Sequence, residues 1–218
     1  MGAGPQLDSA VFLVDVGYRR VDDQAHRWMC LFQVGPQLAM VGMQRLGRGT
    51  GHNRQAHVSA VEKLAEIPVP ERAEYLRVIS SELQRIASHL IATGFLLQEM
   101  GAFATPLIYC FRERERILDM FEMLSGARIT LSYMRPGGVT QDAPKEFWDA
   151  LKVFQEDMPG YIDELESLIT GNEIVLARTR DVGVLSPELA INGSVTGPNL
   201  RASTVQWDLR KADPYDVY

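Results

Sequence analysis

The densest run of charged residues is Phe111-Arg112-Glu113-Arg114-Glu115-Arg116, in which arginine and glutamate alternate. Alternating charges on a helix usually pair with one another on a solvated face, and this is the simplest interpretation. Three arginines near the start of a helix also oppose the helix macrodipole, which costs stability unless an anionic partner lies nearby. The alternative is therefore that these guanidinium groups bind the carboxylates of a partner.

A second candidate is the segment of residues 133–139, in which Arg135 precedes the triplet Pro136-Gly137-Gly138. This triplet predicts a tight turn whose backbone can approach another surface closely. An ordinary connection between two helices accounts for the same residues equally well. The pattern alone leaves both interpretations open.

The histidines show no metal-binding pattern. His52 and His57 are five residues apart, whereas two ligands on one helix face are typically four apart. His89 falls on a long predicted helix, where a lone histidine is more often a hydrogen-bonded core residue than a ligand. The sequence also lacks a nucleotide-binding glycine loop, a nucleophile elbow and a zinc-protease motif. The residues alone therefore indicate a helical subunit or binding module, with neither a catalytic residue nor a metal site.

Composition narrows the class of protein. The 218 residues are 46% hydrophobic and carry a net charge of −6, which permits a buried core and argues against nucleic-acid binding. Cys30 and Cys110 are too few and too far apart for a disulfide scaffold or a cysteine zinc site. No apolar run is long enough to span a bilayer, and no secretion signal is recognisable, so a cytosolic compartment is expected.

The chain changes character after residue 54. Residues 1–54 contain no Lys, Glu or Ile and are rich in Gly, whereas residues 55–218 are acidic. A change this abrupt separates two segments. In the first segment only residues 11–14 and 38–43 are candidates for short strands.

Beyond residue 54 the sequence predicts a mainly α fold of long packed helices. Leu76, Ile79, Leu83 and Leu90 recur three and four residues apart, as they do on the buried face of one helix. Prolines and glycines mark the helix boundaries. The predicted helices cover residues 55–66, 70 to near 101, 106–125 and 144–170, the last interrupted at Met158-Pro159-Gly160, with a short helix capped by Ser186 and a loop-rich remainder from residue 192.

Several blocks, in a fixed order, resemble one known family across residues 55–218. They include Phe111-Arg112-Glu113-Arg114-Glu115 and Arg135-Pro136-Gly137-Gly138-Val139. The other blocks are residues 55–64, 70–78, 82–90, 117–119, 121–122, 125–128, 183–187 and 196–201. Together they are similar to the D subunit of the proton-pumping NADH-quinone oxidoreductase, respiratory complex I, whose fold is shared by the large subunit of nickel–iron hydrogenases.

The resemblance implies a peripheral-arm subunit on the cytoplasmic side of the cell membrane. With the iron–sulfur B subunit it forms the chamber in which a [4Fe–4S] cluster of that neighbour reduces quinone. The C subunit and the membrane-embedded H subunit are further partners. The complex couples electron transfer from NADH to quinone with proton translocation. This chain itself is expected to hold no cofactor or metal, NAD being used elsewhere in the complex, and hydrogenase chemistry is not expected because the paired nickel cysteines are missing.

The resemblance also assigns roles to residues. Arg85, Arg128 and Arg135 match arginines at the interface near the cluster. Glu99 lies where the family has an acidic residue linked to the histidine of the quinone site. The residues placed around the quinone chamber are Arg85, His89, Glu99, Arg128, Thr130 and Arg135, and those placed at a subunit interface are Arg112, Glu113, Arg114 and Glu115.

The chain also departs from the family's pattern. The N-terminal hairpin with its histidine signature is not recognisable in residues 1–54, Gly47 stands where a tyrosine is expected, and Thr130 stands where many members have a histidine. Residues 1–54 are therefore interpreted as an atypical segment, either mistranslated or diverged. Residues 55–218 are interpreted as the helical core of the D-subunit family, truncated at the C-terminus. The alternative function is a truncated or diverged scaffold or assembly module without quinone chemistry.

Overall fold

The structure is a computed structural model that describes residues 51–102 and 104–218. The strands expected at residues 11–14 and 38–43 lie outside the described residues, as does nearly all of the atypical segment 1–54. Within the described residues, one compact unit extends to Ile162 and also holds Val217, and a second holds residues 163–216 and Tyr218. The expectation of a mainly α fold is confirmed, since nearly all of the regular structure is helical.

The first unit begins with helix α3 (Gly51–Ala65), which the sequence predicted to start four residues later. Helix α4 (Glu71–Leu97) follows Pro70, and Glu71 and Glu74 in its first turn favour the positive end of the helix. A short π-helical segment, η2 (Gln98–Ala102), continues α4, and Gly101 takes a φ of 89° there. The predicted end of this long helix near residue 101 is confirmed.

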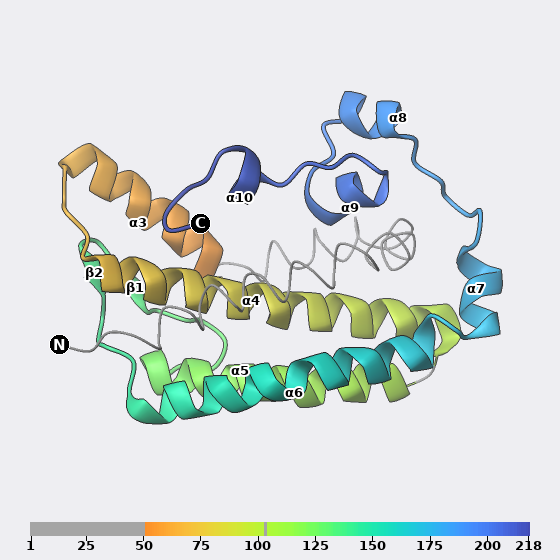
Figure 1. Ribbon diagram of the computed structural model, residues 1–218, viewed down its shortest axis with the longest axis horizontal. Coiled ribbons are helices and arrows are strands. Elements are labelled where there is room, and N and C mark those ends of the chain that lie inside the picture. Colours follow the sequence, from red (N-terminus) through yellow and green to blue (C-terminus); the bar gives the residue numbers. More distant parts are fainter. Residues whose placement is uncertain (1–50, 103) are drawn as a thin grey trace. The chain divides into compact units, whose positions relative to one another are not determined.

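Helix α5 (Thr105–Ser125) returns alongside α4 (Figure 1). Its end is also as predicted, because Gly126 takes a φ of 71°, which glycine adopts without the strain that a side chain would add. The two helices bury the apolar stripe predicted on α4, and Phe121 and Leu124 of α5 are fully buried as well. Gly94 of α4 lies where the helices approach closely, against Leu107 and Cys110.

A two-stranded hairpin follows α5. Strand β1 (Met134–Arg135) pairs antiparallel with β2 (Gly138–Val139), with Arg135 opposite Gly138. The turn residues are Pro136 and Gly137, and Gly137 has a φ of 87°, as the second central position of a type II turn requires. The tight turn predicted from Pro-Gly-Gly is confirmed.

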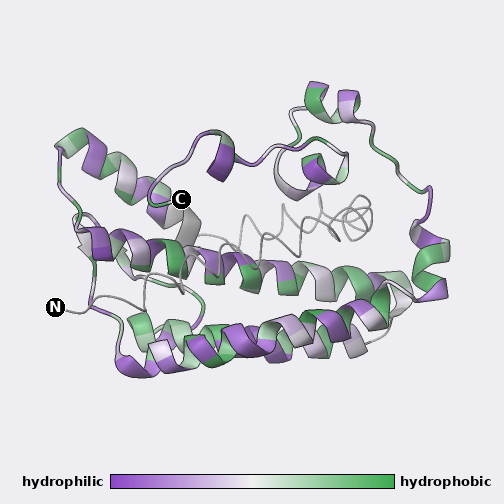
Figure 2. Cartoon of the chain, in the orientation of Figure 1, coloured by the Kyte–Doolittle hydropathy of each residue, from purple (hydrophilic) through white to green (hydrophobic). Residues whose placement is uncertain are grey.

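Helix α6 (Lys145–Ile169) corrects one prediction, because it runs without a break through Pro159. Proline costs a helix one hydrogen bond, but its fixed φ is compatible with helical backbone. Buried side chains on both sides of Pro159 contact α5: Phe154 stacks against Arg116, and the Tyr161 hydroxyl lies 3.5 Å from the Cys110 sulfur. These contacts hold both halves of α6 in line. Figure 2 shows hydrophilic and hydrophobic residues alternating along α4, α5 and α6, as in helices with one buried face.

The second unit contains the end of α6 and four short helices. These are α7 (Glu173–Thr179), α8 (Pro187–Asn192), α9 (Gly197–Ala202) and α10 (Leu209–Ala212). The predicted cap of α8 is confirmed, since the Ser186 hydroxyl accepts a hydrogen bond from the Leu189 backbone N–H. The sequence did not predict α7, α9 and α10, which are too short for apolar periodicity to reveal. None of the helices in the described residues is long and apolar enough to cross a membrane.

Candidate functional site

The alternating charged run does not lie near the start of its helix. Since α5 begins at Thr105, Arg112 is two turns from the helix N-terminus. The macrodipole acts mainly within the first turn, so the expected conflict with three arginines is wrong. Whether these arginines require an anionic partner from another chain therefore depends on their contacts.

Most of these charges find partners inside the chain. Glu113 is buried and accepts hydrogen bonds from Arg112 Nε at 2.8 Å and from Arg116 Nη1 at 3.0 Å. Arg116 also donates through Nη2 to Asp157 of α6 at 2.7 Å. Glu113 is thus the centre of a polar cluster that joins α5 to α6, rather than a residue of a solvated face.

Arg114 differs from its neighbours. Its side chain is mostly buried, and its Nε atom has no hydrogen-bond partner within the described residues. The nearest carboxylate among the described residues, that of Glu115, is 3.8 Å from Nη1, and the guanidinium lies over the Phe111 ring at 5.7 Å. Burial lowers the pKa of the Arg114 guanidinium. A partly desolvated cation with such incomplete pairing in the described residues is stabilised by any further acceptor that reaches it.

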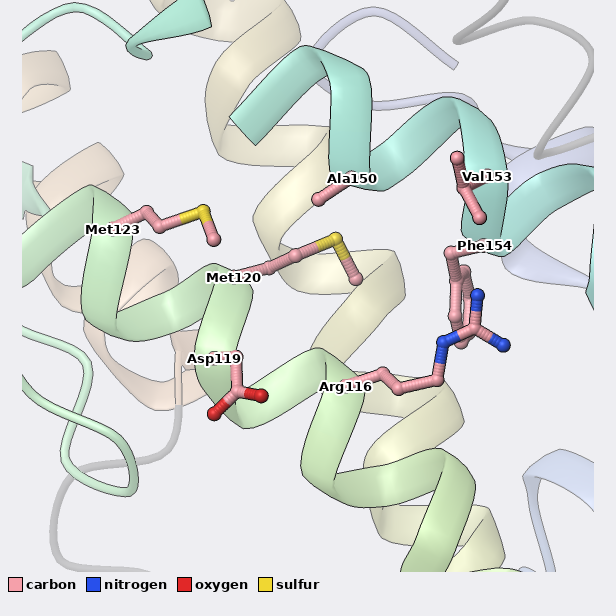
Figure 3. Close-up of a pocket in the computed structure, with 7 residues that line it drawn as sticks. All are labelled: Arg116, Asp119, Met120, Met123, Ala150, Val153 and Phe154. Carbon is pink, nitrogen blue, oxygen red and sulfur yellow. The ribbon is translucent and has the colours of Figure 1, made fainter. Parts of the chain in front are cut away.

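A groove between α5 and α6 lies next to this cluster (Figure 3). Its volume is about 230 Å³. Figure 3 shows Met120 and Met123 of α5 projecting toward the side of α6 that carries Ala150 and Val153. The remaining lining residues are Arg116, Asp119 and Phe154. None of the residues that the sequence placed around a quinone chamber lines this groove.

Arg128 is held by three carboxylates. Its guanidinium forms ion pairs with Glu115, Asp119 and Glu122, which follow one another along a single face of α5. The hydrogen bond to Asp119 raises the pKa of Arg128. With its donors directed at these three residues, Arg128 has little capacity for a further anion.

Arg85 and His89 lie one turn apart on α4, away from the stripe that packs against α5. Arg85 is half-buried and pairs with Glu82 at 3.2 Å. The His89 side chain is exposed, so the interpretation of His89 as a core residue is wrong. Glu99 is exposed in η2, and Thr130 is exposed after the end of α5.

Arg135 is the remaining arginine of the predicted cluster interface. Its side chain is exposed at the end of β1, and its guanidinium has no ion-pair or hydrogen-bond partner in the described part of the chain. Within the described residues, Arg85 and Arg128 have carboxylate partners, whereas the Arg135 guanidinium has none. No hydrogen bond or ion pair between described residues joins Arg135 to the other predicted site residues.

The backbone beneath Arg135 is, in contrast, tightly bound. Arg77 of α4 is buried and donates to the backbone oxygen of Arg135 at 2.8 Å and to that of Gly138 at 2.9 and 3.1 Å. The same guanidinium binds the carboxylate of Glu62 from α3 at 2.6 and 3.0 Å. Glu62 also accepts a hydrogen bond from the Gly137 backbone N–H at 2.7 Å.

Sequence reasoning missed Glu62 and Arg77. A signal was present, because Arg77, Ser80 and Ser81 form a polar group at helical spacing beside the buried leucine stripe of α4. All three are buried, and a buried arginine requires a partner. The hydrogen bond from Arg77 holds the pKa of the Glu62 carboxyl below its usual range, against the opposing effect of burial. Glu62 therefore remains ionised at neutral pH.

These groups are suited to binding an anion or a polar oxygen rather than to bond chemistry of their own. No cluster of three or more metal-ligating side chains occurs in the described residues. Among the described residues of the predicted site, the Arg135 guanidinium and the side chains of His89 and Glu99 are exposed to a molecule outside the chain.

A family model described as "Respiratory-chain NADH dehydrogenase, 49 Kd subunit" matches residues 99–218. The chain is also similar to curated proteins that are named as the D subunit of NADH-quinone oxidoreductase. The protein of Dehalococcoides mccartyi is 58% identical over 170 residues, which are 78% of this chain and 46% of the relative. A Roseiflexus species has a relative of the same name, numbered 1, that is 55% identical over 166 residues, covering 76% of this chain and 44% of the relative. The D subunit of Clostridium beijerinckii is 51% identical over 166 residues, which are 76% of this chain and 45% of the relative. The chain thus spans less than half the length of these relatives.

Proposed function

The chain belongs to the family of the 49 kDa subunit of respiratory-chain NADH dehydrogenase, and we propose that it serves as the D subunit of an NADH-quinone oxidoreductase. The names of the relatives support this proposal, as each is called the D subunit of that enzyme. The partners are then other subunits of the complex. The coupled reaction is electron transfer from NADH to quinone with proton translocation.

In the finer proposal, this chain lies in the peripheral arm at the cytoplasmic side of the cell membrane. It forms the quinone chamber together with the iron–sulfur B subunit, next to the C subunit and the membrane-embedded H subunit. The [4Fe–4S] cluster belongs to the neighbouring subunit, NAD is used elsewhere in the complex, and quinone is the substrate. The residues that face the chamber or the cluster interface are Arg85, His89, Glu99, Arg128, Thr130 and Arg135.

The observation that carries the proposal is that the exposed Arg135 guanidinium has no partner within residues 51–102 and 104–218. Reduction of a quinone builds negative charge on its oxygens, and a fixed cation at the chamber stabilises that charge. Arg128 serves this purpose less well, because three carboxylates of its own chain already surround it. Arg135 is therefore the arginine that we assign to the reacting region.

The test is Arg135→Ala in the assembled complex. We expect NADH-quinone reductase activity to fall strongly, while the melting temperature and the electron transfer to an artificial acceptor that bypasses the quinone site stay close to those of the unaltered complex. Arg72→Ala is the matched control, since Arg72 is also an exposed arginine and its ion pair with Asp142 is worth little. Equal losses of activity and melting temperature in the Arg135 variant would contradict the assignment.

The run Arg112, Glu113, Arg114 and Glu115 was assigned to a subunit interface, and we propose that Arg114 makes the decisive contact. In the described part of the chain the Arg114 guanidinium has only a long ion pair, 3.8 Å from Glu115, whereas Arg112 and Glu113 bind each other. Arg114→Gln should therefore lower the amount of chain recovered in the complex. A Gln variant that assembles as fully as the original would remove Arg114 from the interface.

The rival function is a scaffold or assembly module without quinone chemistry. Thr130 favours it, because an exposed hydroxyl stands where many family members have a histidine, and a threonine hydroxyl does not change its charge near neutral pH as a histidine does. Binding of a quinone analogue to the assembled complex separates the two functions. A scaffold shows no analogue binding that depends on Arg135.

A further inference from the structure

The base of the Arg135 hairpin is held by one buried ion pair. Arg77 contacts the backbone oxygens of both residues of the facing pair, Arg135 on β1 and Gly138 on β2. Glu62 contacts the turn between them through the Gly137 backbone N–H. Both strands and the turn are thereby attached to the junction of α3 and α4.

The hairpin depends on this attachment. Each of its strands has only two residues, and such a short isolated hairpin has little stability of its own in water. The hairpin also lies close to the helices: a side chain added at Gly138 would meet the Ala73 Cβ at 3.6 Å. The Arg135 side chain contributes no anchor, because it has no partner in the described residues.

A buried ion pair is a weak means of stabilising a fold, because the cost of removing both charges from water offsets most of their attraction. Arg77 and Glu62 are both buried, yet both direct hydrogen-bonding groups at the hairpin backbone. The planar guanidinium fork fixes directions as well as distances, which an ammonium group does not. This arrangement is suited to setting the position of one backbone segment.

We infer that Glu62 and Arg77 are positioning residues for Arg135, fixing the hairpin from which its uncommitted guanidinium meets an anionic or polar oxygen outside the chain. This inference rests on the proposed function for the identity of that oxygen, which is then a group of the quinone or of the adjoining subunit. The pair does not touch the reacting group itself. It acts through the backbone of residues 135–138.

The experiment uses assembled complexes with Arg77→Lys, which keeps the charge beside Glu62 and loses the fork, and with Glu62→Gln, which keeps the side-chain shape. The matched control is Ser81→Ala, because the Ser81 hydroxyl also links α4 to α3, through Gln55 at 2.6 Å, but does not contact the hairpin. Each complex is measured for kcat and KM with quinone, for transfer to an artificial acceptor, and for amide hydrogen exchange of the peptide covering residues 134–139.

We expect faster exchange in the hairpin peptide of Arg77→Lys and Glu62→Gln, and unchanged exchange there in Ser81→Ala. We also expect kcat/KM for quinone to fall roughly tenfold or more, because small displacements of a positioned group are costly. The kinetic effect should disappear when Arg135→Ala is present, since the pair acts only through Arg135. Transfer to the artificial acceptor should not change.

Two results would overturn the inference. Unchanged hairpin exchange in both variants would show that the pair does not hold the turn. The second result is faster hairpin exchange together with a fall in kcat/KM that Arg77→Lys causes equally in the Arg135→Ala background and in the original protein. It would show that Arg77 has a general structural role. A failure of the proposed function is recognised separately, because Arg135→Ala alone would then leave quinone reduction intact whatever the exchange data show.

Discussion

Gly94 allows the packing of α4 on α5 to be tested with a single methyl group. A Cβ at this position would lie 3.0 Å from Leu107 Cδ1, 3.3 Å from Leu107 Cα and 3.3 Å from Cys110 Cβ. The Leu107 methyl can rotate away, but the other two atoms are fixed to the backbone of α5. The helices must therefore separate by a few tenths of an ångström to admit an alanine.

Two opposing effects set the magnitude. Replacing glycine by alanine inside a helix stabilises it by about 1 kcal/mol. Overpacking a close-packed helix contact costs about 1–3 kcal/mol. We expect Gly94→Ala to lower the free energy of unfolding by up to about 2 kcal/mol once the helix gain is subtracted.

Gly160 provides the control. It is also inside a helix, α6, and a Cβ there would have no neighbour within 4 Å. Gly160→Ala should therefore show the helix gain alone, about 1 kcal/mol of added stability. Urea unfolding of the 218-residue chain, followed by far-UV circular dichroism at one protein concentration, compares the two variants directly. If Gly94→Ala stabilised the chain as much as Gly160→Ala, the close approach of α4 and α5 at Gly94 would be refuted.

Three further predictions follow from buried groups and from α6. Arg77 lowers the pKa of folded Glu62, so the pair stabilises the chain above the unfolded carboxyl value near 4.5 and loses this effect as the pH falls below it. The unfolding midpoint of Glu62→Gln should therefore fall less over this acid range than that of the original chain. If both midpoints fell with the same dependence on pH, the pairing of Glu62 with Arg77 would be contradicted. Burial raises the pKa of the Cys110 thiol, so iodoacetamide should label Cys110 far more slowly in the folded chain than in urea. Mass spectrometry of the Cys110 peptide measures the labelling, and equal rates in both conditions would place the thiol at the surface. Pro159→Ala should raise the free energy of unfolding in urea by up to about 3 kcal/mol, because α6 is continuous there, whereas a loss of stability would indicate that α6 needs the proline.

The long helices could be predicted because their signals are local. The apolar spacing of α4 repeats over many turns, and proline and glycine mark the limits of α4 and α5. Pro159 shows where local signals fail. The sequence predicted that Pro159 interrupts α6, but contacts of α6 with Arg116 and Cys110 keep the helix continuous. Both residues are far from Pro159 in the sequence, so no local pattern reveals these contacts.

The candidate site depends even more on distant contacts. Glu62 and Arg77 are on different helices, and their common contact with the 135–138 turn arises only when α3, α4 and the hairpin come together. The sequence offered Arg77 as a polar residue beside an apolar stripe but gave no direction for its side chain. Long-range hydrogen bonds of this kind leave no periodicity in the sequence, and for this reason they were missed.

The arginines show why residue type alone does not define an anion site. Glu115, Asp119 and Glu122 are spaced four and three residues apart, so their common face on α5 can be deduced from the sequence. That Arg128 folds back onto this face depends on the left-handed turn at Gly126, which changes the direction of the chain. An arginine surrounded in this way must give up carboxylates before it can bind another anion. Arg135 has no such carboxylate to give up among the described residues, because a hydrogen bond to its backbone, rather than its side chain, holds it in place. An incoming negative charge therefore meets the smaller barrier at Arg135.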